Sequence, residues 1–182
     1  RWEHVGPNNR FAIFRAKPDG TDMFVLYGKF SAGNSFLHPR EMDPRGTYAG
    51  QLVTSLMSPS GTREGGALMM VDAANYSEQN TPTSRAVALA GGQRQMTDRS
   101  LNDGRGLSMF GRVTTPFPLW DGTDRVLVSY RPCEVTRNGD VIPCATLTQA
   151  ELDRLCSDRT MADEAADAIQ DNAPPAYAVY MV

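Results

Sequence analysis

The sequence predicts an all-β protein made of short antiparallel strands, with one short helical segment inserted near its end. Short runs of apolar and β-branched residues recur along the 182 residues, and Gly, Pro, Asn and Asp separate them. The only convincing helical pattern begins at a capping box formed by Thr148 and Glu151. These observations favour small sheets joined by tight turns.

The composition limits the classes of protein to which the chain can belong. With 41% hydrophobic and 21% charged residues, the chain is typical of a globular domain with a core. A net charge of −3 argues against a nucleic-acid-binding surface. No apolar run approaches the roughly 20 residues that a membrane-spanning helix needs, so we expect no membrane span. The chain begins at Arg1 without a signal peptide and ends within an apolar alternation at Val182, which indicates a piece of something longer.

The first predicted element is a hairpin. Residues 11–16 and 23–27 are strand-like, and Pro18 and Gly20 between them favour a turn.

The remaining elements are predicted along the chain. After the helix that begins at Thr148, continued helical composition is expected over 158–172. Further strands are expected at 51–57, 67–72, 86–90, 126–130 and 176–182, and loops at 29–37, 58–66, 75–84 and 91–106.

The most complete unit lies at 117–130, where a proline-bearing approach leads to an Asp-Gly turn and then to an alternating β-branched run. The tetrapeptide Asp-Gly-Thr-Asp occurs both here, at 121–124, and in the first hairpin, at 19–22. Asp can hydrogen-bond the backbone that follows it, and Gly can adopt positive φ. We therefore expect both Asp-Gly pairs to serve turn geometry and not ligand binding.

Alignment of these pieces indicates a repeat. The strands at 11–16, 67–72 and 177–182 would occupy the same place in three units, and those at 51–57 and 126–130 the place just before it. Repeated antiparallel sheets predict a partial β-propeller, here a single segment over residues 1–182 with about three incomplete blades and an insertion at 133–175. A β-sandwich is the competing architecture. Three partial units cannot close a ring, so we expect open edges at both ends.

Two groups of motifs resemble known proteins. The run at 118–129, and the strand at 13–16 followed by Pro-Asp-Gly-Thr at 18–21, look like the TolB-type propeller repeat. Residues 33–39 leading into 61–66 are similar to proteins related to the propeller region of the hydrazine synthase alpha subunit. This resemblance implies an extracytoplasmic protein whose haem, if any, lies on partner domains. The chain has no Cys-x-x-Cys-His, so we expect no cofactor in this segment.

Residues for a catalytic or metal site are scarce. His4 and His38 are the only histidines, and neither lies in a local ligand pattern, so we expect no catalytic residue and no metal site. His38, before Pro39, is interpreted as a strand-end packing or hydrogen-bonding residue, with a ligand- or partner-facing role as the alternative. Arg63 and Glu64 either face a ligand or partner from the propeller mouth or form a weak ion pair on a solvated turn.

The sharpest prediction is a disulfide between Cys133 and Cys144. Asn-Gly at 138–139 favours a two-residue type I′ turn, and counting outward from it places the two cysteines opposite each other. In this register Pro143 falls at a non-hydrogen-bonded position, where its missing N–H costs little. The cysteine pair falls at the wider position, with Cα atoms about 5.5 Å apart, which a disulfide can span.

This disulfide would stabilise the fold by about 3 kcal/mol and would indicate an oxidising compartment. Cys156 would then be a buried free thiol, on one helix face with Leu152 and Leu155, or a bridge to other sequence. The alternative is three reduced cytosolic cysteines.

No nucleophile, base and orienting residue stand together in the sequence. We therefore expect a non-catalytic extracytoplasmic propeller segment that docks a partner protein, or other blades or domains of a longer chain. The alternative is part of a multidomain extracytoplasmic enzyme, a hydrazine synthase alpha-like redox protein or a hydrolase, whose catalytic residues or haem lie outside this chain.

Overall fold

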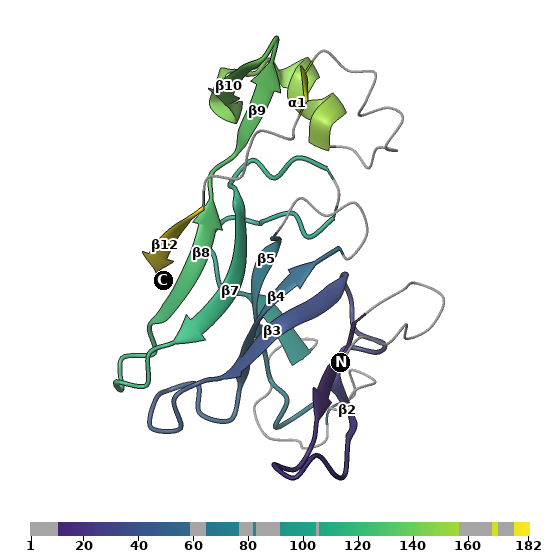
Figure 1. Ribbon diagram of the computed structural model, residues 1–182, viewed down its shortest axis with the longest axis vertical. Coiled ribbons are helices and arrows are strands. Elements are labelled where there is room, and N and C mark those ends of the chain that lie inside the picture. Colours follow the sequence, from purple (N-terminus) through teal and green to yellow (C-terminus); the bar gives the residue numbers. More distant parts are fainter. Residues whose placement is uncertain are drawn as a thin grey trace.

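A computed structural model describes residues 11–58, 65–76, 82, 92–104, 106–156, 169–170 and 177–182 of the protein. This part is mostly β, as predicted, and consists of antiparallel sheets of which none closes on itself (Figure 1). The first sheet is the predicted hairpin of β1, Ile13–Arg15, and β2, Phe24–Tyr27. Its turn is closed by the Gly20 N–H, which donates to the Lys17 carbonyl over 2.9 Å.

The second sheet has four strands in chain order: β3, Ser35–Glu41; β4, Leu52–Met57; β5, Ala67–Val71; and β6, Gln93–Gln95. Every residue of β4 and β5 is buried, because other parts of the chain cover both faces of this sheet. On one face, the rings of Tyr27 and Phe36 meet edge to face with centroids 5.6 Å apart.

The predicted loop at 29–37 was wrong at its end, because β3 already begins at Ser35. The Phe11 N–H donates to Ser35 Oγ over 2.8 Å, and the Phe36 N–H donates to the Phe11 carbonyl over 3.0 Å. Hydrogen bonds with Phe11, which lies just before β1, therefore help to place Ser35 and Phe36 in β3. Pro39 is tolerated in β3 because this strand lies at the edge of its sheet.

The predicted loop at 91–106 was also wrong in part, because β6 forms within it and pairs with β5. Its residues Gln93, Arg94 and Gln95 have no apolar alternation, so backbone pairing and not side-chain pattern makes the strand. The predicted strand at 86–90 and most of the predicted loops at 58–66 and 75–84 lie outside the described residues.

The third sheet has the order β12–β8–β7, where β7 is Arg112–Pro118, β8 is Val126–Arg131 and β12 is Ala178–Met181. The strands predicted at 126–130 and 176–182 are thus confirmed. The approach at 117–118 is the end of β7 and not a separate segment. β7 packs against β3, β4 and β5, so the third sheet lies beside the second (Figure 1).

Strands β3–β4–β5 and β7–β8–β12 repeat one another in register. β3 and β7 each carry a bulge at a residue with positive φ that precedes a proline, His38 at 54° and Thr115 at 50°. The structure therefore agrees with the predicted alignment of β4 with β8 and of β5 with β12, whereas β1 pairs only with β2 among the described strands. The matching pairs are Leu37–Ser55 with Thr114–Ser129, Arg40–Val53 with Phe117–Leu127, and Leu56–Ala67 with Tyr130–Ala178.

The segment after β8 forms a small separate unit, drawn at the top of Figure 1. Strands β9, Glu134–Arg137, and β10, Asp140–Pro143, pair in the predicted register. Cys133 and Cys144 form the predicted disulfide with Cα atoms 5.4 Å apart, and the Cys144 N–H donates to the Cys133 carbonyl over 3.0 Å. A 3-10 helix follows at Cys144–Thr146.

Helix α1, Gln149–Cys156, begins at the predicted capping box, in which the Thr148 N–H donates to Glu151 Oε2 over 2.8 Å. Leu155 is fully buried. The helical continuation expected at 158–172 is wrong for its described residues, because Ile169–Gln170 form strand β11 on β9, and the rest lies outside the described part. None of the described helices has the length and apolar character to cross a membrane.

Candidate docking face

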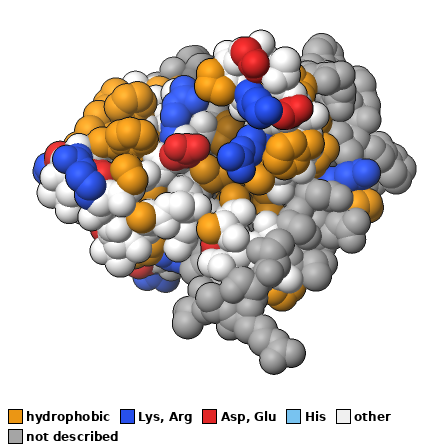
Figure 2. All heavy atoms as spheres, turned by 90° about the horizontal axis from the view of Figure 1, so that it is seen from below, with side chains coloured by type: hydrophobic (Ala, Val, Ile, Leu, Met, Phe, Trp, Pro, Cys, Tyr) orange, Lys and Arg blue, Asp and Glu red, His pale blue; other side chains and the backbone are white. Residues whose placement is uncertain are grey.

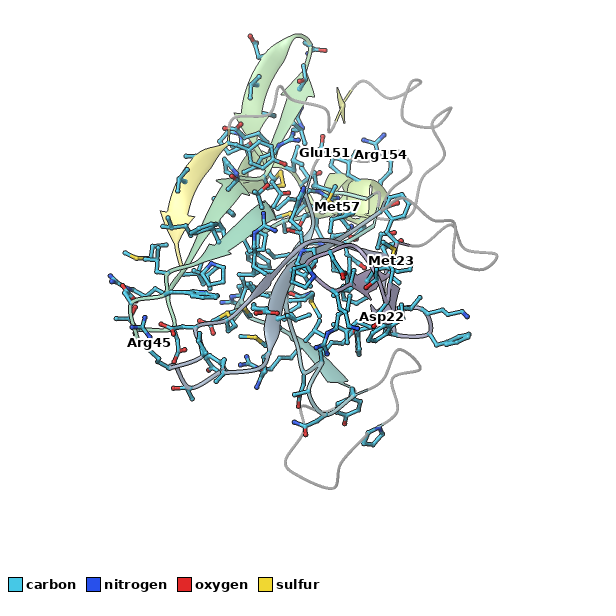
Figure 3. The ribbon with its side chains drawn as sticks, turned by 60° about the horizontal axis from the view of Figure 1, so that its bottom comes forward. Asp22, Met23, Arg45, Met57, Glu151 and Arg154 are labelled. Carbon is cyan, nitrogen blue, oxygen red and sulfur yellow. A yellow bond between two sulfur atoms is a disulfide. The ribbon has the colours of Figure 1, made fainter. Side chains whose placement is uncertain are left out.

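The turns that follow β3 and β7 interlock and hold the third sheet on the second. The buried Asp43 carboxylate accepts hydrogen bonds from Arg45 Nε over 3.1 Å and from the Gly122 N–H over 2.9 Å. The indole of Trp120 donates to the Glu41 carbonyl over 3.2 Å. Figure 3 shows Arg45 at this end of the molecule, with Glu151 and Arg154 towards the other. Hydrogen bonds from Arg45 lower the pKa of Asp43 to about 2.

The two predicted Asp-Gly turns have the same geometry. Asp19 Oδ1 accepts from the Thr21 N–H over 2.9 Å, and Asp121 Oδ1 accepts from the Thr123 N–H over 3.1 Å. The φ angle of Gly122 is 81°, which favours glycine. The carboxylates are thus used within the turns, and the Gly122 N–H contributes to the contact between sheets.

Of the three residues that the sequence offered as ligand- or partner-facing candidates, His38 is the one that lies in the described part of the chain. His38 lies in the middle of β3 at the bulge and is exposed, so its placement as a packing residue at a strand end was wrong, while a hydrogen-bonding role stays a prediction. A partner-facing role for His38 stays a prediction. Arg63 and Glu64 lie outside the described residues. No group of His, Cys, Asp and Glu within the described ranges could hold a metal ion.

The third sheet has one covered face and one open face. Val113, Val126 and Val128 belong to the core shared with the second sheet. Because side chains alternate along a strand, Leu127 lies on the opposite face, between its cross-strand partners Phe117 and Met181. We call this set, together with Val179, the outer face; its residues are Phe117, Leu127, Val179 and Met181.

The outer face is apolar and accessible. Phe117 is 58% exposed, Met181 54% and Val179 71%. Figure 2 shows hydrophobic side chains gathered on the side of the molecule where β7, β8 and β12 lie, next to charged ones. Single exposed apolar residues are ordinary on a protein surface, but neighbours across three paired strands form a continuous patch.

The repeat allows the burial of the outer face to be compared with that of the equivalent positions in the second sheet. By register, Leu127, Val179 and Met181 correspond to Val53, Leu68 and Met70. These three residues have no exposed surface. They lie on the face opposite Phe36, towards β7. These three strand positions are therefore apolar in both units, but among the described residues a sheet packs over them in the first unit alone.

The edge of β12 is open as well. In the second sheet, β6 pairs with the far side of β5, whereas no described strand pairs with the far side of β12. An unpaired edge offers backbone N–H and C=O groups to a further strand. The outer face and this edge together form the candidate docking face.

Comparison of the chain with family models, curated proteins and solved structures finds no match. Only the geometry of the molecule therefore bears on its function. The sequence contained one signal for the docking face: residues 178–182 are apolar at every position, as in strands covered on both faces. The position of Leu127 opposite Phe117 could not be predicted, because the bulge at Thr115 sets their register.

Proposed function

We propose that the protein is a non-catalytic, extracytoplasmic β-propeller segment whose docking face binds a further antiparallel sheet of the same kind. The observation that carries this proposal is a difference in burial between equivalent positions. Val53, Leu68 and Met70 have no exposed surface, whereas Val179 and Met181 are exposed and Leu127 is half-buried. A β-propeller is built from similar antiparallel sheets, each of which packs its face on the next sheet.

The chemistry of the partner follows from the contact already present. The third sheet covers the second with β-branched side chains, namely Val113, Val126 and Val128. A partner for the outer face should therefore present a sheet face rich in apolar and β-branched residues. Either other blades of a longer chain or a partner protein would supply this sheet. In both cases one of its strands would pack on β8 as β7 packs on β4.

The extracytoplasmic location is supported by the disulfide. The bond between Cys133 and Cys144 closes a hairpin that packs with Leu147 and Leu155 in a small core. Structural disulfides persist in oxidising compartments and are rare in the cytosol. Mass spectrometry of a non-reduced digest of natively purified, thiol-trapped protein should find the two cysteines linked, and an unlinked Cys133 peptide would contradict the location.

Site-specific photo-crosslinking tests the docking proposal. A benzoylphenylalanine at position 179, in the cells that make the protein, should crosslink to a peptide that forms a strand with alternating apolar residues. Position 145 is the control, because Ala145 is exposed in the 3-10 helix of the small separate unit. Equal crosslinking from both positions, or no peptide crosslinked from position 179, would argue against the docking face.

A further inference from the structure

A groove of about 360 Å³ lies on the opposite side of β12 from most of the outer face. One wall is formed by β8 and β12, with Val128, Tyr130 and Tyr180, and the other by the segment between β6 and β7, with Arg99 and Phe110. This volume falls within the range of small-molecule sites, which is roughly 300–1,000 Å³.

Three aromatic rings determine the character of the groove. Tyr130 and Tyr180 meet edge to face with centroids 5.1 Å apart, and the Tyr130 hydroxyl donates to the Phe110 carbonyl over 3.3 Å. Phe110 is 47% and Tyr180 50% exposed, so two of the rings present accessible surface. Planar apolar ligands gain from stacked or edge-to-face contact with such rings.

The repeat explains why a groove is present here. Tyr130 and Tyr180 correspond by register to Leu56 and Met69 of the second sheet, which are buried. In the third sheet it is β7 that packs against the second sheet, while β12 lies two strands away from that contact. The space beside β12 is therefore lined by large aromatic side chains and remains accessible.

A cation lies at the rim. The Arg99 guanidinium stands over the Phe110 ring at 5.5 Å from its centroid. Arg99 has no ion pair with any residue in the described part of the chain, so its N–H groups are available to an anion. Asp98 also lines the groove and brings a carboxylate to the same rim, which opposes an anionic ligand.

We propose that this groove binds a small aromatic carboxylate, with its ring against Phe110 and Tyr180 and its carboxylate on Arg99. Guanidinium groups bind carboxylates through paired N–H donors, and the aromatic walls supply apolar contact for the rest of the molecule. The proposal is separate from the docking proposal, because Met181 is the one residue that the groove shares with the outer face.

The test uses 2-naphthoate, with neutral 2-naphthalenemethanol as the comparison ligand, titrated into the isotope-labelled chain and followed by NMR. Naphthoate should shift the amide signals of 97–101, 110 and 178–182. Arg99→Gln should weaken naphthoate binding by about fivefold and leave the alcohol unchanged, since an exposed ion pair contributes at most about 1 kcal/mol. Asp98→Asn should tighten naphthoate binding by about twofold.

Arg40→Gln is the matched control, because Arg40 is an exposed cation on β3 outside the groove. It should leave both affinities unchanged. The proposal is overturned by the absence of shifts at millimolar naphthoate. It is equally overturned if Arg99→Gln and Arg40→Gln have the same effect, or if the shifts fall on Leu127 and Ser129 and not on the groove. All variants change exposed side chains, and their amide spectra show whether each remains folded.

Discussion

At the scale of single residues, Asp43 connects the two repeated units. Its carboxylate is buried and is held by three donors of Arg45 and by the Gly122 N–H, which belongs to the turn of the other unit. A buried carboxylate that loses its charge also loses the strength of these bonds. The charge of Asp43 therefore strengthens the contact between the two sheets, in addition to the Trp120–Glu41 hydrogen bond and the shared apolar core.

Asp43→Asn should destabilise the protein in a pH-dependent way. The pKa of Asp43 is about 2 in the folded protein, mainly because of the hydrogen bonds from Arg45. In the unfolded chain it is about 3.9. Ionised Asp43 thus stabilises the fold fully above pH of about 4, and this contribution is lost as the pH falls through about 2. The melting temperatures of the two proteins should differ most near neutral pH and converge in acid.

Asp140→Asn provides the control for this prediction, because Asp140 is exposed at the β9–β10 turn. Its melting temperature should follow that of the unchanged protein. A gap between Asp43→Asn and the unchanged protein that stayed constant down to pH 2 would show that the lost interaction does not involve the charge of Asp43.

Local geometry was predictable at this scale, and contacts between distant residues were not. The disulfide and both Asp-Gly turns follow from the order of neighbouring residues, because a turn type and a strand register are set within a few positions. The bond from the Gly122 N–H to Asp43 joins residues 79 positions apart. The sequence around Asp43 contains no signal of this partner.

At the scale of elements, the two bulges are the feature that the repeat preserves. His38 and Thr115 both have positive φ, and each precedes a proline. Positive φ is uncommon outside glycine, and for a β-branched residue such as threonine it is strained. The recurrence of this conformation in both units indicates that the bulge shapes β3 and β7 for packing at the interlocked turns.

Thr115→Asn should therefore stabilise the protein by about 0.5–1 kcal/mol, because asparagine adopts positive φ more readily than threonine. Thr115 is exposed, so the change removes no buried contact. Thr114→Asn is the control one position earlier in regular β7, where asparagine should be neutral or destabilising. Urea unfolding of the three proteins measures the difference, and equal effects at both positions would contradict strain at Thr115.

Elements defined by their side-chain pattern could be predicted from the sequence, and elements defined by backbone pairing could not. β4, β5 and β8 are rich in apolar residues, and α1 has its capping box, so the sequence pattern alone located them. β6 is Gln-Arg-Gln, and its formation depends on the open edge of β5. For the same reason the candidate groove was missed, since the sequence around 97–101 and Phe110 has no apolar period, and these residues form a wall only through their packing.

At the scale of the whole molecule, the described residues form two separate cores. The larger core joins the first three sheets, and the smaller one contains Leu107, Val135, Cys144, Leu147 and Leu155. A core of so few side chains contributes little stability by itself. Two bonds therefore contribute much of the stability of this unit. They are the disulfide between Cys133 and Cys144 and the hydrogen bond from the Leu107 N–H to the Leu155 carbonyl over 2.7 Å.

Reduction of the disulfide should loosen the small unit and leave the sheets intact. Without the bond the unfolded hairpin regains entropy equivalent to about 3 kcal/mol, more than a core of five residues readily offsets, whereas the larger core is unchanged. Hydrogen exchange measured by mass spectrometry, with and without reductant, should therefore show faster exchange in 134–143 and 149–156 and unchanged protection in β4, β5 and β8. The variant Cys133→Ser with Cys144→Ser should show the same pattern without reductant. A uniform rise in exchange across both cores would mean that they unfold as one cooperative unit.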